Sequence, residues 1–171
     1  MSSLSSLPYR GRTALLLLPL LVLSACAPAQ DDPDDRLVEL REELSDRFTP
    51  GLHTLMVDLG MRHASLWFAG EAENWPLADY MSHELEELVG EIEELHPVYD
   101  EVQVAAMIRE MTHPAMEALE DAVEDGDRAA FVEAHDRLTQ ACNACHTASN
   151  RAALVIQRPT APPLTNLRYS R

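Results

Sequence analysis

A run of five residues, Cys142-Asn143-Ala144-Cys145-His146, constrains this chain more than any other part of it. Two cysteines three positions apart, with a histidine directly behind them, form the C-x-x-C-H pattern of covalent c-type haem attachment. On a helix, Cys142 and Cys145 project from adjacent turns of one face, where each thiol can form a thioether with a haem vinyl group. His146 lies four residues after Cys142, so its imidazole can serve as the fixed axial ligand of the iron. The pattern therefore predicts one covalently bound haem c.

The same cysteine spacing occurs in zinc sites and in dithiol redox sites, which are the alternatives. A structural zinc site usually needs four ligands, and the sequence contains no second cysteine pair. A thioredoxin-like dithiol is expected between a strand and a helix, whereas the flanks here have a helical pattern. A helical protein without haem, in which Cys142 and Cys145 form a dithiol or a disulfide, stays open as an alternative.

The first 25 residues have the three parts of an export signal. Arg10 and Arg12 form a basic segment, residues 14–23 are apolar, and small residues precede Cys26. The apolar run is too short to cross a bilayer as a permanent helix. The sequence Leu-Ser-Ala-Cys is similar to a bacterial lipoprotein signal, which makes Cys26 the first mature residue and the site of acylation. We therefore expect a lipid anchor on the periplasmic side of a bacterial membrane; an ordinary secretory signal cleaved nearby is the alternative.

The chain is strongly acidic, with 29 Asp and Glu residues against 13 basic residues, all of them Arg. Removal of Arg10 and Arg12 with the signal changes the formal charge from −16 to −18. Such a field argues against nucleic acid and an anionic membrane surface as partners. It would steer a basic redox partner, with an association rate that falls as salt rises. The alternative is that the acidity serves solubility in a saline habitat.

From Arg36 onward the apolar residues follow a helical period, and no alternating strand pattern occurs. The clearest stripe steps by three or four positions through Leu77, Met81, Leu85, Leu88, Ile92 and Leu95. We expect helices over residues 36–47, 51–69, 75–96, 98–124 and 128–151. The chain then divides into a signal peptide (1–25), an acylated polar linker (26–35), a helical haem-binding domain (36–151) and an extended, proline-rich tail (152–171).

Four residues are expected to mark helix boundaries. Gly70 suits the position just after a helix, and Asn74 can cap the helix that follows. Pro114 predicts a kink or short break just before it, because proline has no backbone N–H. Asp127 is the predicted N-cap of the last helix.

Helices of this length with short connections predict an all-α fold, an antiparallel four-helix bundle with haem bound at the C-terminal helix. A helical bundle with C-x-x-C-H on its last helix resembles the class II cytochromes c, of the cytochrome c-prime and c-556 type. The resemblance covers residues 36–151 in architecture and is specific at Cys142, Cys145 and His146, which it implies are the thioether sites and the proximal ligand. Relatives of this class are often homodimers. The chain departs from the class in its proline-rich tail and in lacking basic residues around the motif.

The opposite face of the iron decides between electron transfer and gas binding. In the c-556 type, the resemblance implies a methionine sixth ligand on the first bundle helix. The equivalent helix here, residues 51–69, contains His53, Met56, Met61 and His63. Met56 and His63 share the apolar stripe of this helix and are expected to point inward, while His53 and Met61 lie more to the side. Met56 is the preferred sixth ligand and His63 the second candidate, although a methionine also serves as core filler and a core histidine as a hydrogen-bonding group.

The remaining histidines carry no expectation of a cofactor. His83 and His135 lie among acidic residues and are expected to be exposed. His96 and His113 each precede a proline, so helix ends explain them. The sequence also shows no nucleophile triad and no glycine-rich phosphate loop.

Small exported mono-haem proteins mostly carry electrons, and no catalytic apparatus is visible. We therefore expect a membrane-tethered one-electron carrier and not an enzyme. The first alternative is a five-coordinate haem protein that binds NO or CO through an apolar distal pocket. The second is the non-haem helical lipoprotein with a dithiol or disulfide pair.

Overall fold

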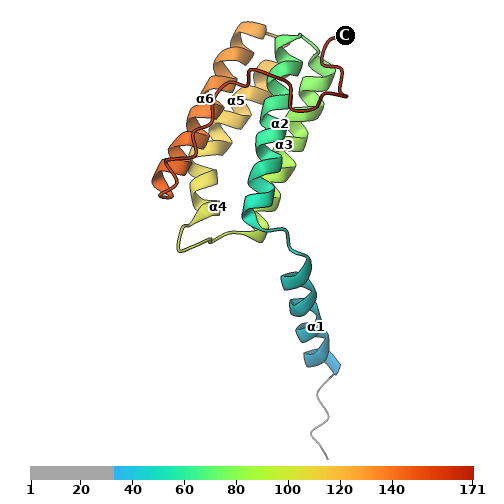
Figure 1. The fold of residues 1–171 in the computed structure, drawn as a ribbon, viewed down its shortest axis with the longest axis vertical. Helices are drawn as coiled ribbons and strands as arrows, with labels where there is room; N and C mark the ends of the chain where they lie inside the picture. The colour runs from blue at the N-terminus through green and yellow to red at the C-terminus, as the bar shows by residue number, and fades with distance from the viewer. Residues whose placement is uncertain (1–32) are drawn as a thin grey trace, which may run out of the picture. The chain divides into compact units, whose positions relative to one another are not determined.

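The computed structural model describes residues 33–171, which form an all-helical structure (Figure 1). The proposed signal peptide, Cys26 and most of the linker lie outside the described residues. Within 33–171 there is no strand; the nearest feature is an isolated bridge between Tyr99 and Val102. The helical elements are α1 (Pro33–Phe48), α2 (Leu52–Glu71), α3 (Trp75–Leu95), α4 (Val104–Met107), the π-helix η1 (Ile108–Thr112), α5 (His113–Glu124) and α6 (Arg128–Ala148).

The chain divides into two units, residues 1–43 and 44–171. Helix α1 begins at Pro33, three residues before the predicted start, so the last residues of the expected linker are helical. Proline at a first helical position and Asp34 and Asp35 in the first turn both suit a helix N-terminus. No helix within the described residues combines the length and apolar character needed to cross a membrane.

Helices α2, α3, α5 and α6 lie side by side, with contacts between α2 and α3, α3 and α5, α5 and α6, and α2 and α6 (Figure 1). The predicted stripe of α3 faces the core: three of its members are buried and the other three pack against that core. At one end, the rings of Trp67 and Trp75 lie 6.3 and 6.1 Å from the ring of Phe131. Burial of each large apolar side chain contributes roughly 1.5–3 kcal/mol, so this interior holds the helices together.

The prediction that Gly70 ends its helix is wrong, because α2 continues to Glu71 with Gly70 inside it. Gly70 lies directly against the side chain of Phe131, and a Cβ at this position would collide with the aromatic ring. Position 70 requires a glycine because α2 and α6 approach closely there, and not because the helix ends there. The glycine is therefore a packing residue.

The break predicted before Pro114 is confirmed, in the form of the π-helix η1 that ends at Thr112. Proline lacks the N–H of a regular helix, and the wider π-turn accommodates that missing bond. The predicted start of this helix at residue 98 is wrong. Residues 98–103 form a loop in which Asp100 and Glu101 have positive φ angles, and α4 begins only at Val104.

At the start of α6 the predicted cap is confirmed: the Asp127 carboxylate accepts hydrogen bonds from the backbone N–H groups of Ala129 (2.8 Å) and Ala130 (3.1 Å). Asn74 stands at the start of α3, but its side chain makes no capping bond. Its Nδ2 donates instead to the carbonyl of Tyr169 in the tail, at 3.0 Å. Asn74 thus joins the start of α3 to the tail.

The tail contains no helix, as predicted, and it follows α6, which ends at Ala148 and not at 151. It lies against the helices over much of its length (Figure 1). Tyr169 is buried, and its hydroxyl is 3.2 Å from the Ser65 hydroxyl of α2. The tail is thus part of the folded unit.

Gly70→Ala should lower the free energy of unfolding by about 1–3 kcal/mol, because the added methyl group overpacks the contact with Phe131. The matched control is Gly90→Ala in α3, where nothing lies within 4 Å of an added Cβ. That variant should gain about 0.5–1 kcal/mol from reduced backbone freedom of the unfolded chain. Urea unfolding curves of both variants check the prediction, and equal stability of the two would contradict it.

Candidate functional site

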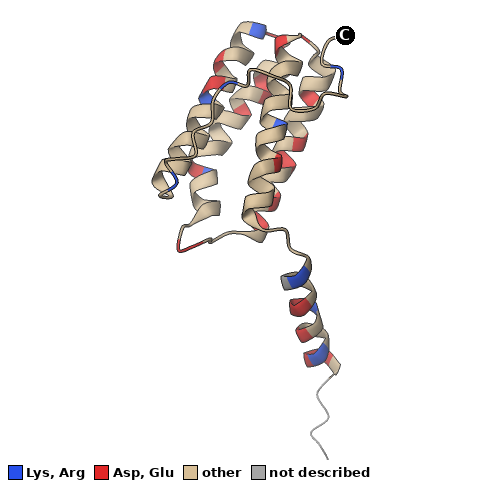
Figure 2. Cartoon of the chain, in the orientation of Figure 1, with Lys and Arg blue, Asp and Glu red and all other residues tan. Residues whose placement is uncertain are grey.

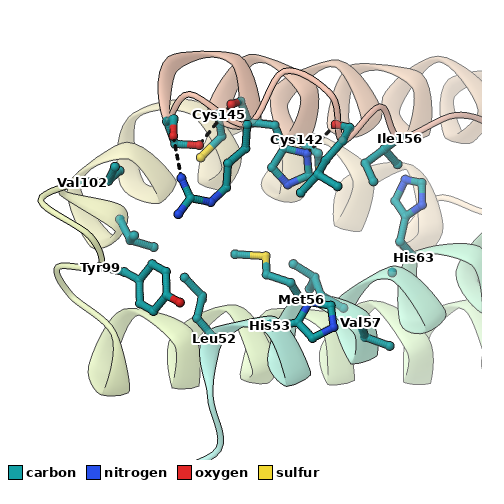
Figure 3. A pocket seen from close by; sticks show the side chains of 17 residues that line it. Leu52, His53, Met56, Val57, His63, Tyr99, Val102, Cys142, Cys145 and Ile156 are labelled. Atoms are coloured by element: carbon teal, nitrogen blue, oxygen red, sulfur yellow. Dashed lines mark hydrogen bonds between the residues drawn. The ribbon is translucent and has the colours of Figure 1, made fainter.

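A cavity of about 340 Å³ lies between α2 and the end of α6, within the size range of small-molecule sites (Figure 3). Side chains from the 98–103 loop, from the start of α4 and from the tail complete its walls. The lining is predominantly apolar, with Leu52, Val57, Leu59, Val102 and Ile156 among its members. Such a cavity suits a large apolar group that also has a few polar attachment points.

The three motif residues all line this cavity. Cys142 and Cys145 stand on the α6 side, opposite the α2 residues (Figure 3). Both thiols are free and partly buried. The sequence expectation that a helix carries both sulfurs to one face therefore agrees with the structure.

Burial raises the pKa of both thiols, that of Cys142 to about 11. Burial therefore favours the neutral thiol over the thiolate at both positions. A redox dithiol needs a thiolate with a lowered pKa, so the raised values disfavour the thioredoxin-like alternative. Among residues 33–171 there is also no group of three or more His, Cys, Asp or Glu side chains placed to hold a metal ion.

His146 is oriented by a hydrogen bond from its Nδ1 to the backbone carbonyl of Leu154, at 2.9 Å. A carbonyl oxygen can only accept, so Nδ1 carries the proton of the neutral imidazole and Nε2 carries the lone pair. Metal-binding histidines typically have this arrangement, in which a carbonyl or carboxylate holds the ring nitrogen that does not bind the metal. His146 is thus in the tautomer that an Nε2 ligand requires.

On the opposite wall, Met56 is partly buried and extends into the cavity from α2 (Figure 3). His63 also lines the cavity, so both preferred candidates face the motif. Met61 is 41% exposed and does not line it. His53, expected to lie to the side, is nevertheless among the lining residues. Three α2 residues with possible ligand atoms line this cavity, and the helical stripe predicted two of them, Met56 and His63.

His63 is held by a buried hydrogen-bond chain that determines its tautomer. The Thr139 hydroxyl donates to the carbonyl of His135 at 2.9 Å, so its oxygen accepts from Nε2–H of His63 at 3.0 Å. The lone pair of the His63 imidazole is therefore on Nδ1. Burial, with a smaller effect of His135, lowers the pKa of His63 from 6.5 to about 3.

The prediction that His135 is exposed is wrong, because this side chain is fully buried. Its ring lies 4.2 Å from that of His63 and 4.9 Å from that of Trp67. Its Nε2 donates to the carbonyl of His63 at 3.2 Å, while the buried Nδ1 has no partner within the described structure. The signal was present in the sequence: His135 follows Phe131 by four positions, on the face that continues to Cys142. His83, in contrast, is exposed as predicted.

Sequence reasoning missed the walls contributed by the loop and the tail. Arg151 is the one Arg or Lys among the residues that line the cavity. Its guanidinium donates to the Ser149 carbonyl at 2.9 Å and to the Asp100 carboxylate at 3.1 Å, and it lies 5.8 Å from the ring centre of Tyr99. No local sequence pattern predicts these contacts, because loop and tail segments have no periodicity that identifies their neighbours.

Comparison of this chain with protein-family models, with curated proteins and with solved structures finds no match in any of the three. Its function is therefore inferred from the residues of the cavity. Those residues offer two thiols, three histidines, one methionine and a single guanidinium in a predominantly apolar lining.

The buried histidines should make stability depend on pH in a defined direction. The pKa of His63 is about 3 in the folded protein, below the ordinary 6.5, so the unfolded chain binds the proton first as pH falls. This contribution is complete above pH 6.5 and is lost as pH falls from 6.5 toward 3, with about 2 kcal/mol lost between pH 7 and pH 5. His63→Gln, which does not titrate, should show a smaller decrease than the parent in urea unfolding at these two pH values.

His83→Gln is the matched control, because His83 lies on the exposed face of α3. It should keep the full pH dependence of the parent. A His63→Gln variant that loses as much stability as the parent between pH 7 and pH 5 would refute the assignment of this effect to His63.

Proposed function

We propose that this protein is an exported, lipid-anchored mono-haem c-type cytochrome that transfers single electrons and catalyses no substrate reaction. Thioethers at Cys142 and Cys145 would join the haem to α6, and His146 would be the axial iron ligand. The observation that best supports this is that all three side chains line one apolar cavity, with Met56 on the facing helix. In this proposal α2, α3, α5 and α6 form the antiparallel four-helix bundle of a class II-like cytochrome.

The residues of the cavity fit a haem by their chemistry. The apolar side chains of the walls match the apolar faces of a porphyrin ring. His146 presents Nε2 as a lone-pair donor, because its Nδ1–H is held by Leu154. Arg151 is the cation available to the haem carboxylates, which carry negative charge into an acidic protein. When bound, the haem supplies an iron that changes between the ferric and ferrous states.

Met56 is the proposed sixth ligand. His63 already uses its Nε2–H in the bond to Thr139, and its imidazole is packed against His135. Binding iron through Nε2 would leave the buried Thr139 hydroxyl without its donor, at a cost of about 1–3 kcal/mol, so only Nδ1 of His63 remains as a ligand atom. The Met56 thioether has no such commitment and lies among apolar residues. Two protein ligands would keep the iron low-spin, as electron transfer requires.

A basic redox protein is the proposed partner. Acidic residues are distributed over the helices, whereas Arg residues are fewer (Figure 2). A field of this sign accelerates encounter with a positively charged protein and repels nucleic acid. Acylation of Cys26 would hold the cytochrome on the periplasmic side of the membrane, where c-type haem is attached.

Protein matured with haem-attachment machinery should contain one haem that resists acid–acetone extraction, because thioethers hold it to the polypeptide. A pyridine haemochrome spectrum should show the band of a haem with both vinyl groups saturated. Cys142→Ala should give the spectrum of a haem with one vinyl group remaining. Absence of covalent haem from the parent protein would refute the proposed function and favour the non-haem lipoprotein.

Met56→Ala should convert the iron from low spin to high spin, because removal of the thioether vacates the sixth coordination position. Optical and electron paramagnetic resonance spectra report the change, and CO should bind the variant but not the reduced parent. Met61→Ala, on the same helix but outside the cavity, is the matched control and should leave the spectra unchanged.

An unchanged low-spin spectrum in Met56→Ala would exclude Met56 and direct attention to His63. A parent protein that is high-spin and binds CO would instead support the gas-binding alternative.

A further inference from the structure

The tail contacts the C-x-x-C-H motif through two motif side chains. Asn143, a residue that the motif leaves open, makes a pair of hydrogen bonds with the backbone of Ile156. Its Nδ2 donates to the Ile156 carbonyl at 2.9 Å, and its Oδ1 accepts from the Ile156 N–H at 2.7 Å. Two residues earlier in the tail, the Leu154 carbonyl accepts from His146. One short tail segment is therefore tied to both Asn143 and His146.

The paired bonds at Asn143 determine which carbonyl faces His146. A side-chain amide that both donates and accepts imitates the pairing of two β-strands. In an extended segment, alternate residues direct their carbonyls to the same side, so those of Leu154 and Ile156 face α6 together. A slip by one residue would turn both carbonyls away from α6. Asn143 thus holds the register that places the Leu154 carbonyl against the imidazole.

Further contacts hold this segment on both sides. On the motif side, the Arg151 N–H donates to the His146 carbonyl at 2.7 Å, and the Leu154 N–H donates to the Arg151 carbonyl at 2.8 Å. On the other side, the Arg158 guanidinium makes two hydrogen bonds to the Asp136 carboxylate, at 2.7 and 2.5 Å. These contacts anchor the segment at Arg151 and Arg158, and the pair of hydrogen bonds at Asn143 holds the stretch between them in register.

We propose that Asn143 is a positioning residue for the axial ligand, acting by holding the Leu154 carbonyl on the Nδ1–H of His146. This inference rests on the proposed haem function. A carbonyl that accepts the Nδ1 proton makes Nε2 a stronger electron donor, which stabilises ferric over ferrous iron. The tail would thereby lower the reduction potential of the haem without touching the iron.

The test is Asn143→Ala, which leaves both cysteines and His146 in place. Its midpoint potential should be higher than that of the parent, because the imidazole donates less strongly once the carbonyl is free. The His146 Nδ1 proton should also exchange faster with solvent, as measured by nitrogen-15 NMR on the protein as purified. Thr147→Ala is the matched control, because the Thr147 hydroxyl donates to the Asn143 carbonyl within α6 and not to the tail.

The direction in which the midpoint potential shifts distinguishes a positioning role of Asn143 from a general loosening of the site. If the substitution only admitted water to the cavity, the ferric charge would be better solvated and the potential would fall. A fall, an unchanged potential in a haem-loaded variant, or unchanged exchange of the Nδ1 proton would overturn the proposal. If the purified protein carries no haem, the proposed function fails, and the exchange rate alone decides whether Asn143 holds the His146 bond.

Discussion

The structure depends on one continuous face of α6, which forms part of the core and then enters the cavity. Its first members, Phe131 and Leu138, are buried among the other helices, and Cys142 packs against that core at the cavity end. Because helical spacing repeats along this face, any rotation of α6 that improved the core would also move the cysteines. Packing at one end of the helix therefore fixes which way the motif points at the other.

Chains of hydrogen bonds determine which atom of each buried polar side chain donates and which accepts. The Thr139 hydroxyl gives its proton to a backbone carbonyl and so must accept from His63. The Leu154 carbonyl similarly determines which nitrogen of His146 is protonated. In each case a backbone carbonyl, which can only accept, fixes the role of a hydroxyl or imidazole that could otherwise donate or accept. The two histidines therefore carry their lone pairs on different ring nitrogens, Nε2 in His146 and Nδ1 in His63.

Much of the helical framework and the heart of the candidate site could be predicted from local patterns. Apolar periodicity located α3, the Asp127 carboxylate located the start of α6, and C-x-x-C-H located three residues that line the cavity. The failures share a physical cause, since each depends on contact between distant segments. Gly70 is small because Phe131 packs on it, and Asn74 bonds to the tail instead of capping. His135 is the exception, because the helical face it occupies was readable and its acidic neighbours were given too much weight.

The wall that the tail adds to the cavity has a consequence for the order of assembly. Residues 151–156 follow the motif in the chain, so if the protein is exported as proposed, Cys142, Cys145 and His146 would leave the export channel before that wall exists. During this interval the motif is open on the side that the tail later covers. In the proposed function, haem would attach at this early stage, and the tail would then pack over the motif and cover the haem on that side.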